Sequence, residues 1–317
     1  MEIYGPVPSW RLGNSLGIDL ISPPSGFNRK CPFACIYCQL GDNGLKSCTQ
    51  EGTTFNPEQF DLLAKKIAKT KPDFITFSGK GEPTLNSDLG KIARKIRETF
   101  SIPVAVLTNA FMVGNPAVRN ALDECDLVIA KIDAATQELF EKINRPAEDI
   151  KLSDIIAGIS LLKTKVSIQT LLFSYNVLTN ADEKSIKELI RVYKKIYNTK
   201  PINIFLGTAY RPSSLLELKT LPQKELKQIA WQITHETGIE VIYYQGKKSQ
   251  KVPGKFNFSE LEREVFELLQ RRPCTEEELL SRFGSESLNT LATLCKKAIV
   301  EEKLEKNSKY FFLIPEK

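Results

Sequence analysis

Three cysteines lie within eight residues near the start of the chain, and they are the strongest candidates for chemistry. Cys31, Cys35 and Cys38 have the spacing C-x3-C-x2-C, and thiolates so close in sequence are expected to converge on one centre. Zinc prefers four tetrahedral ligands, and Cys48 lies near enough to supply a fourth. An iron–sulfur cluster held by three cysteines keeps one iron open to a substrate or cofactor. The spacing favours the cluster, because structural zinc sites usually use C-x2-C pairs on both sides.

A second motif, Ser78-Gly79-Lys80-Gly81-Glu82-Pro83-Thr84-Leu85, follows the second predicted strand. Together with the cysteine spacing, and with Tyr37 before the last cysteine, it resembles the signature of the radical S-adenosylmethionine (radical SAM) superfamily. The Gly-Gly-Glu motif of that superfamily has a Gly-Glu-Pro form here. The resemblance covers about residues 1–245. It implies one [4Fe–4S] cluster per chain on Cys31, Cys35 and Cys38, with S-adenosylmethionine (SAM) on the open iron.

The resemblance also implies which side chains contact SAM. Tyr37 is expected beside the cofactor, Gly79 and Gly81 let the backbone approach it closely, and Glu82 can accept hydrogen bonds from its ammonium group. A tight turn with an exposed acid is the structural alternative for this loop. One-electron reduction of SAM would then give a 5′-deoxyadenosyl radical.

Further polar residues lie at or near the ends of predicted strands. By resemblance we expect Asn109, Asp133 and Gln169 to bind SAM, with turn caps or internal hydrogen bonds as the alternative roles. Lys131 and Arg211 are charges in similar positions. Each could bind a carboxylate or phosphate of cofactor or substrate, or form a buried ion pair.

Within the superfamily, Tyr4-Gly5-Pro6-Val7-Pro8-Ser9 and Tyr210-Arg211-Pro212 resemble the wyosine-synthase-related branch. Wyosine synthases carry additional upstream cysteines for a second cluster, whereas no cysteine precedes Cys31 in this sequence. We therefore expect a single cluster and a reaction other than wyosine synthesis. A reducing partner such as flavodoxin or ferredoxin is expected. No catalytic residue is predicted, and the substrate stays open among a peptide or protein, RNA and a small molecule.

The elements that must position these residues alternate between short β-branched runs and amphipathic stretches, which predicts βα units around a parallel sheet. Six or seven units fall short of the eight of a closed barrel, so we predict an α/β fold, a partial (β/α)6 TIM-like barrel, with the site at the carboxyl ends of its strands. The predicted strands are 17–21, 74–78, 104–107, 127–131, 165–172, 202–207 and 239–243. The predicted helices are 57–69, 88–100, 115–124, 136–142, 150–162, 181–196 and 223–235.

The polar, lysine-rich segment 245–256 reads as a linker between a barrel of residues 1–244 and a C-terminal domain of residues 257–317. Helices at 259–269, 275–283 and 287–297, the first two capped by Ser259 and Thr275, precede a hairpin of 300–304 and 310–313, which predicts a winged helix. This domain holds ten Lys or Arg and twelve Glu, so we do not expect it to bind DNA. Packing against the barrel or presenting a substrate is expected instead. The alternative function is a zinc-stabilised winged-helix DNA-binding protein.

The composition limits the classes of protein and of catalysis that the chain can represent. The 317 residues are 42% hydrophobic and 26% charged, with a net charge of +6, which is ordinary for a globular protein. No apolar run reaches the ~18 residues of a membrane span, and no signal sequence is recognised, so we expect a cytoplasmic protein without a membrane partner. The single histidine, His235, argues against Ser-His-Asp and Cys-His catalysis. Cys48 is expected to be a catalytic thiol or a small core residue.

Overall fold

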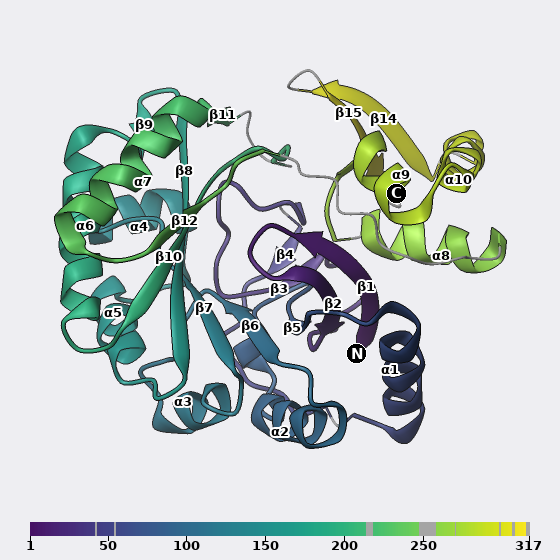
Figure 1. The fold of residues 1–317 in the computed structure, drawn as a ribbon, viewed down its shortest axis with the longest axis horizontal. Helices are drawn as coiled ribbons and strands as arrows, with labels where there is room; N and C mark the ends of the chain where they lie inside the picture. Colours follow the sequence, from purple (N-terminus) through teal and green to yellow (C-terminus); the bar gives the residue numbers. More distant parts are fainter. Residues whose placement is uncertain are drawn as a thin grey trace.

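A computed structural model describes residues 1–41, 43–53, 55–213, 218–246, 258–269, 271–297, 299–305 and 308–314. Its largest feature is a ten-stranded, mostly parallel sheet (Figure 1). From β2 to β12 all neighbouring strands of the main path are parallel. In spatial order these strands are β2 (Gly13–Asp19), β5 (Phe74–Phe77), β6 (Val104–Thr108), β7 (Leu127–Lys131), β8 (Lys165–Tyr175), β10 (Ile202–Thr208) and β12 (Val241–Tyr243). The α/β class is confirmed, and the sheet is consistent with a partial TIM-like barrel.

In the described part of the chain, seven α-helices connect the parallel strands and cover one face of the sheet. Several begin at side chains of types that favour the N-cap position: Asn56 caps α1 in a capping box, and Thr136 and Asp182 cap α4 and α6. The helices are α1 (Pro57–Thr70), α2 (Leu89–Phe100), α3 (Pro116–Leu122), α4 (Gln137–Asn144), α5 (Leu152–Ser160), α6 (Glu183–Tyr197) and α7 (Gln223–Thr237).

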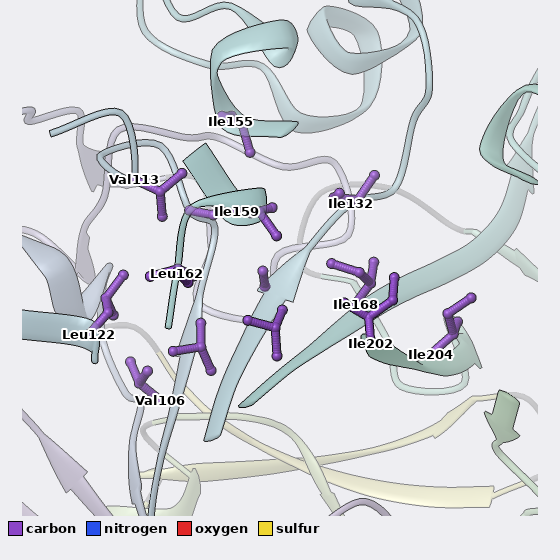
Figure 2. Close-up of a cluster of buried hydrophobic side chains, with 14 of the residues drawn as sticks. Val106, Val113, Leu122, Ile132, Ile155, Ile159, Leu162, Ile168, Ile202 and Ile204 are labelled. Atoms are coloured by element: carbon purple, nitrogen blue, oxygen red, sulfur yellow. The ribbon is translucent and has the colours of Figure 1, made fainter. Parts of the chain in front are cut away.

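The main hydrophobic core lies between these helices and the sheet. Strand residues such as Val106, Ile168 and Ile204 lie in one buried cluster with Leu122 and Ile159 of the helical layer (Figure 2), on the face that alternate residues of a strand share. The other face of the strands points into the barrel interior and remains available for a site.

The N-terminal residues form a strand that the sequence did not predict. β1 (Glu2–Ser9) pairs antiparallel with β2, and β2 begins at Gly13 rather than at residue 17. Prolines are tolerated in β1 because it lies at the edge of the sheet. The turn between the two strands places Leu12 in a small cluster with Ala105, Ile129 and Phe205. The turn therefore fills part of the barrel interior.

The C-terminal residues form a compact unit with its own buried cluster. It contains α8 (Phe258–Leu269), α9 (Glu276–Phe283) and α10 (Glu286–Lys296), with a sheet in the order β13 (Cys274–Thr275), β15 (Ser308–Leu313) and β14 (Val300–Glu305). Thr275 caps α9 in a capping box as predicted, whereas the side chain of Ser259, the other predicted cap, lies outside the described residues. The winged-helix class and the domain limits stay predictions. Residues 247–256 of the predicted linker lie outside the described residues.

This unit contacts the barrel on two sides (Figure 1). On one side α8 packs against β1, and Glu264 of α8 pairs with Lys66 of α1 at 2.5 Å. On the other side Arg211, which follows β10, pairs with Glu278 of α9 at 2.7 Å. The unit therefore touches β1 at one edge of the sheet and the loop after β10 near the other.

Candidate functional site

A cavity of about 460 Å³ opens on the interior face of the sheet, between the barrel strands and the C-terminal unit. Its wall includes all three motif cysteines. It also includes most of the other predicted site residues, namely Tyr37, Gly79, Gly81, Glu82, Asn109, Lys131, Gln169 and Arg211. Asp133 and Cys48 do not line it. Residues predicted from separate motifs are thus gathered around one space.

The cysteine loop is held from two directions. It follows the short strand β3 (Arg29–Lys30), which pairs with β4 (Gly44–Leu45). On one side the Lys30 N–H donates to the Lys80 carbonyl at 2.9 Å, and the Glu82 N–H donates to the Lys30 carbonyl at 3.1 Å. On the other side the Ile36 N–H donates to the carbonyl of Ile143, near the end of α4, at 2.9 Å. These bonds fix the cysteines against both the Gly-Glu-Pro loop and α4.

The three thiols have the surroundings of cluster ligands. None forms a disulfide. The Asn109 side-chain amide lies 3.5 Å from the Cys31 sulfur, and that of Asn144 lies 3.5 Å from the Cys35 sulfur. Burial raises the pKa of all three thiols, that of Cys35 to about 11, so a bound cation would be needed to hold them as thiolates. Amide donors to sulfur are among the contacts that tune iron–sulfur clusters, and these residues fit such a group.

A single metal ion fits less well. Within the described part of the chain, no three His, Cys, Asp or Glu side chains are placed to hold one ion. In a cubane each cysteine binds a different iron, so the sulfurs need not meet at one point. Cys48, considered as a fourth zinc ligand, a catalytic thiol or a core residue, is exposed and does not line the cavity. The core assignment is therefore wrong, and the zinc-stabilised DNA-binding alternative has no support.

The two glycines of the second motif are required by packing within the protein. A Cβ on Gly81 would lie 2.1 Å from the Lys30 carbonyl oxygen. A Cβ on Gly79, whose φ is +159°, would lie within 2.4 Å of the Asp19 carboxylate. The sequence predicted that these glycines admit a cofactor. The close approach visible here is to β3 and to the end of β2, which brings the cysteine loop against the motif.

Glu82 is buried, and both of its carboxylate oxygens are occupied by internal donors. Oε1 accepts from the Thr84 N–H at 3.1 Å, the Thr84 hydroxyl at 2.7 Å and the Thr108 hydroxyl at 2.5 Å, and Oε2 accepts from the Asn109 N–H at 2.7 Å. Burial raises the pKa of Glu82, although these donors oppose that shift. Glu82 therefore ties the motif to the end of β6 and positions Asn109. Its contact with the SAM ammonium group stays a prediction.

Asp133 lies behind the cavity wall. Its Oδ2 accepts from the Tyr37 hydroxyl at 2.5 Å and from the Asn144 amide at 3.1 Å. Its Oδ1 accepts from the Lys131 ammonium group and from the Leu171 N–H. Asp133 thus positions Tyr37 and Lys131, which do line the cavity. Of the roles predicted for Lys131, the structure shows the ion pair, formed with Asp133. Burial lowers the pKa of Lys131.

Four arginines on the cavity wall were not found by reasoning from the sequence: Arg11, Arg29, Arg271 and Arg272. The Arg11 guanidinium donates to the side chain of Gln169, one of the predicted cofactor ligands. Arg271 and Arg272 come from the segment after α8, so the C-terminal unit contributes to the cavity. No local sequence signal marks these residues, because distant parts of the chain bring them together.

The sequence of this chain is similar to those of several known proteins. A family model described as the radical SAM superfamily matches residues 26–193. The GTPase Obg of Brachyspira hyodysenteriae is 28% identical over 309 residues, which are 96% of this chain and 43% of that protein, so the chain spans less than half of this relative. A UPF0026 protein of Methanocaldococcus jannaschii is 31% identical over 294 residues, which are 88% of this chain and 86% of that protein.

A solved structure shares the fold. A radical SAM methyltransferase from Sphaerobacter thermophilus aligns with a TM-score of 0.53 and 16% identity, covering 73% of this chain and 67% of that chain. Separately, none of the helices in the described ranges is long and apolar enough to cross a membrane. The family model spans more than half of the chain and includes both motifs, and the protein therefore belongs to the radical SAM superfamily of iron–sulfur enzymes, within the UPF0026 family.

Proposed function

We propose that this enzyme holds one [4Fe–4S] cluster on Cys31, Cys35 and Cys38 and uses it to cleave SAM reductively. When bound, the cluster would supply the electron that breaks the S–C5′ bond of SAM and gives methionine and a 5′-deoxyadenosyl radical, which would act on a substrate still to be identified. The observation that carries the proposal is the arrangement of the site. Three cysteines of one loop line the same cavity as Gly79, Gly81 and Asn109.

The surrounding residues have defined tasks in this proposal. Asn109 and Asn144 direct amide N–H groups at the sulfurs of Cys31 and Cys35, which favours thiolate over thiol. Glu82 holds the Asn109 backbone in place through a 2.7 Å hydrogen bond. These contacts preorganise the loop before any cofactor binds.

Exclusion of water is the second task of the chain. A radical that abstracts hydrogen needs a site closed to competing reactions. Trp10, Phe33 and Tyr37 supply aromatic wall to the cavity, and Leu268 of the C-terminal unit contributes from the other side. We propose that the C-terminal unit covers the open side of the barrel during turnover. A small redox protein such as flavodoxin or ferredoxin is the proposed source of electrons.

Anaerobic reconstitution with iron and sulfide, followed by SAM and dithionite, tests the proposal. We expect the broad visible absorbance of sulfur-to-iron charge transfer and formation of 5′-deoxyadenosine, measured by mass spectrometry. Cys35→Ala should lose both signals. Cys48→Ala is the matched control, because this cysteine is exposed and lies away from the cavity, and it should keep both. Product formation by Cys35→Ala at the wild-type rate would contradict the proposal.

A further inference from the structure

The charged side chains that line the cavity are mostly basic. Six basic side chains line it, whereas Glu82 is its only acidic one among the described residues. The basic residues are Arg11, Arg29, Lys131, Arg211, Arg271 and Arg272. Cationic side chains facing a partly closed cavity repel each other unless anions accompany them.

Two of these charges pair with a carboxylate, and a third lies against the cysteine loop. Lys131 pairs with Asp133, and Arg271 pairs with Glu2 at 2.5 Å. Arg29 donates to the Gly41 carbonyl and lies close enough to Cys38 to oppose the burial that raises the pKa of this thiol. Arg29 therefore belongs with the cysteine loop.

Arg11, Arg211 and Arg272 are left with one carboxylate between them. Glu278 accepts from Arg211 at 2.7 Å and from Arg272 at 3.1 Å. Burial raises the pKa of Glu278, but the two arginines outweigh it and hold that pKa well below its usual range. Arg11 donates to the neutral side chain of Gln169. These three arginines therefore carry two more positive charges than the one carboxylate they share among the described residues.

The hydrogen-bond inventory of these arginines is also incomplete. The Nε groups of Arg11 and Arg211 are buried and have no acceptor in the described part of the chain. A guanidinium presents five N–H donors in a planar fork. A buried donor without an acceptor costs about 1–3 kcal/mol, so the guanidinium groups of Arg11 and Arg211 keep part of their hydrogen-bonding capacity unused.

Aromatic rings hold two of the guanidinium groups in place. Arg11 lies over the Trp10 ring at 5.6 Å, and Arg211 lies over the Tyr210 ring at 4.8 Å. Tyr210 in turn stacks on Tyr244 with ring centroids 4.2 Å apart. The aromatic residues of these contacts lie in the β1–β2 turn and in the loops after β10 and β12. The cysteines, Gly81 and Asn109 lie on other loops.

We propose that Arg11, Arg211 and Arg272 bind an oxyanion of the substrate, a phosphate or carboxylate group. The inference rests on the proposed function and adds to it the chemical class of the substrate, which is an anion. Arginine forks bind both groups in a bidentate manner. The C-terminal unit contributes Arg272 directly and Glu278 as the residue that positions both arginines. The site is therefore complete only when this unit is docked on the barrel.

Titration of the reconstituted, SAM-bound protein with inorganic phosphate and with succinate, followed by calorimetry, tests this inference. Arg11→Gln and Arg272→Gln should each weaken anion binding at least tenfold. Arg191→Gln is the matched control, because Arg191 is an exposed helical arginine paired with Glu188, and it should bind as the wild type does. Binding of phosphate alone would assign a phosphate group, binding of succinate alone a carboxylate, and binding of both the shared subsite.

Two further readouts keep the result interpretable. Phenylglyoxal modifies accessible arginines, and phosphate or succinate should slow the modification of Arg11, Arg211 and Arg272 in the wild-type protein, measured by peptide mapping. This measurement uses only the wild-type protein and therefore does not depend on whether the variants fold. Cluster absorbance and SAM cleavage, recorded on the same samples, test the proposed function separately. If both are normal yet neither anion binds or protects, or if Arg11→Gln and Arg272→Gln bind with wild-type affinity, the inference is overturned and the proposed function stands.

Discussion

Replacement of Gly81 by alanine should damage the cysteine loop through a contact outside the loop itself. The added Cβ would lie 2.1 Å from the Lys30 carbonyl oxygen and 2.8 Å from Cγ2 of Ile21. An ordinary carbon–oxygen contact is at least about 3.3 Å, so the two backbones must separate by about 1 Å. That shift would stretch the 2.9 Å and 3.1 Å hydrogen bonds that join Lys30 to Lys80 and Glu82.

The cost follows from these contacts. Overpacking typically destabilises by about 1–3 kcal/mol, and two weakened backbone hydrogen bonds add about 0.5–1.5 kcal/mol each. We therefore expect Gly81→Ala to lower the free energy of unfolding by about 2–6 kcal/mol in urea titrations. It should also lower the iron content after reconstitution, because Cys31 follows Lys30 directly. Gly114→Ala is the control, since a Cβ there has no atom within 4 Å. Equal stability and equal iron content in the two variants would refute the reasoning.

Two further predictions concern buried polar groups. Burial raises the pKa of Asp19 from 3.8 to about 6, so the folded protein binds a proton here that the unfolded chain releases. The resulting stability is present below pH 3.8 and is lost as the pH rises to about 6. Urea titrations should therefore show the wild type losing about 3 kcal/mol relative to Asp19→Asn across this window, and a pH-independent difference would be evidence against it. Tyr37→Phe removes the hydroxyl that bridges Asp133 and Asn144. It should cost about 1–3 kcal/mol, and an unchanged urea midpoint would show that the bridge is unimportant.

The parallel strands and the motif loops could be predicted from the sequence because their signals are local. Short β-branched runs bounded by turn residues marked the strands. The carboxyl ends of parallel strands lie at one edge, so Gly81 and Asn109, which follow neighbouring strands, meet near Cys31. The strand β1 could not be predicted in this way. Its prolines are typical of a loop, and only its place at the sheet edge makes them acceptable.

The wall opposite the motif loops could not be predicted, because contacts between distant residues build it. Arg11 lies in a short turn, and its partner Gln169 is 158 residues away. Arg211 was recognised as an unusual charge, but its partner Glu278 lies in α9, 67 residues later. Asp133 was expected to contact SAM. Its hydrogen bonds to Tyr37 and Lys131 show that it supports the wall from behind.

Iron content of the cysteine variants tests the central claim most directly. After anaerobic reconstitution and desalting, we expect the wild-type chain and Cys48→Ala to carry the iron of one [4Fe–4S] cluster, with the same absorbance per chain. The triple variant Cys31→Ala, Cys35→Ala, Cys38→Ala should carry almost none. Circular dichroism of the triple variant should show that it is still folded. Retention of wild-type iron by the folded triple variant would contradict the assignment of these cysteines as the cluster ligands.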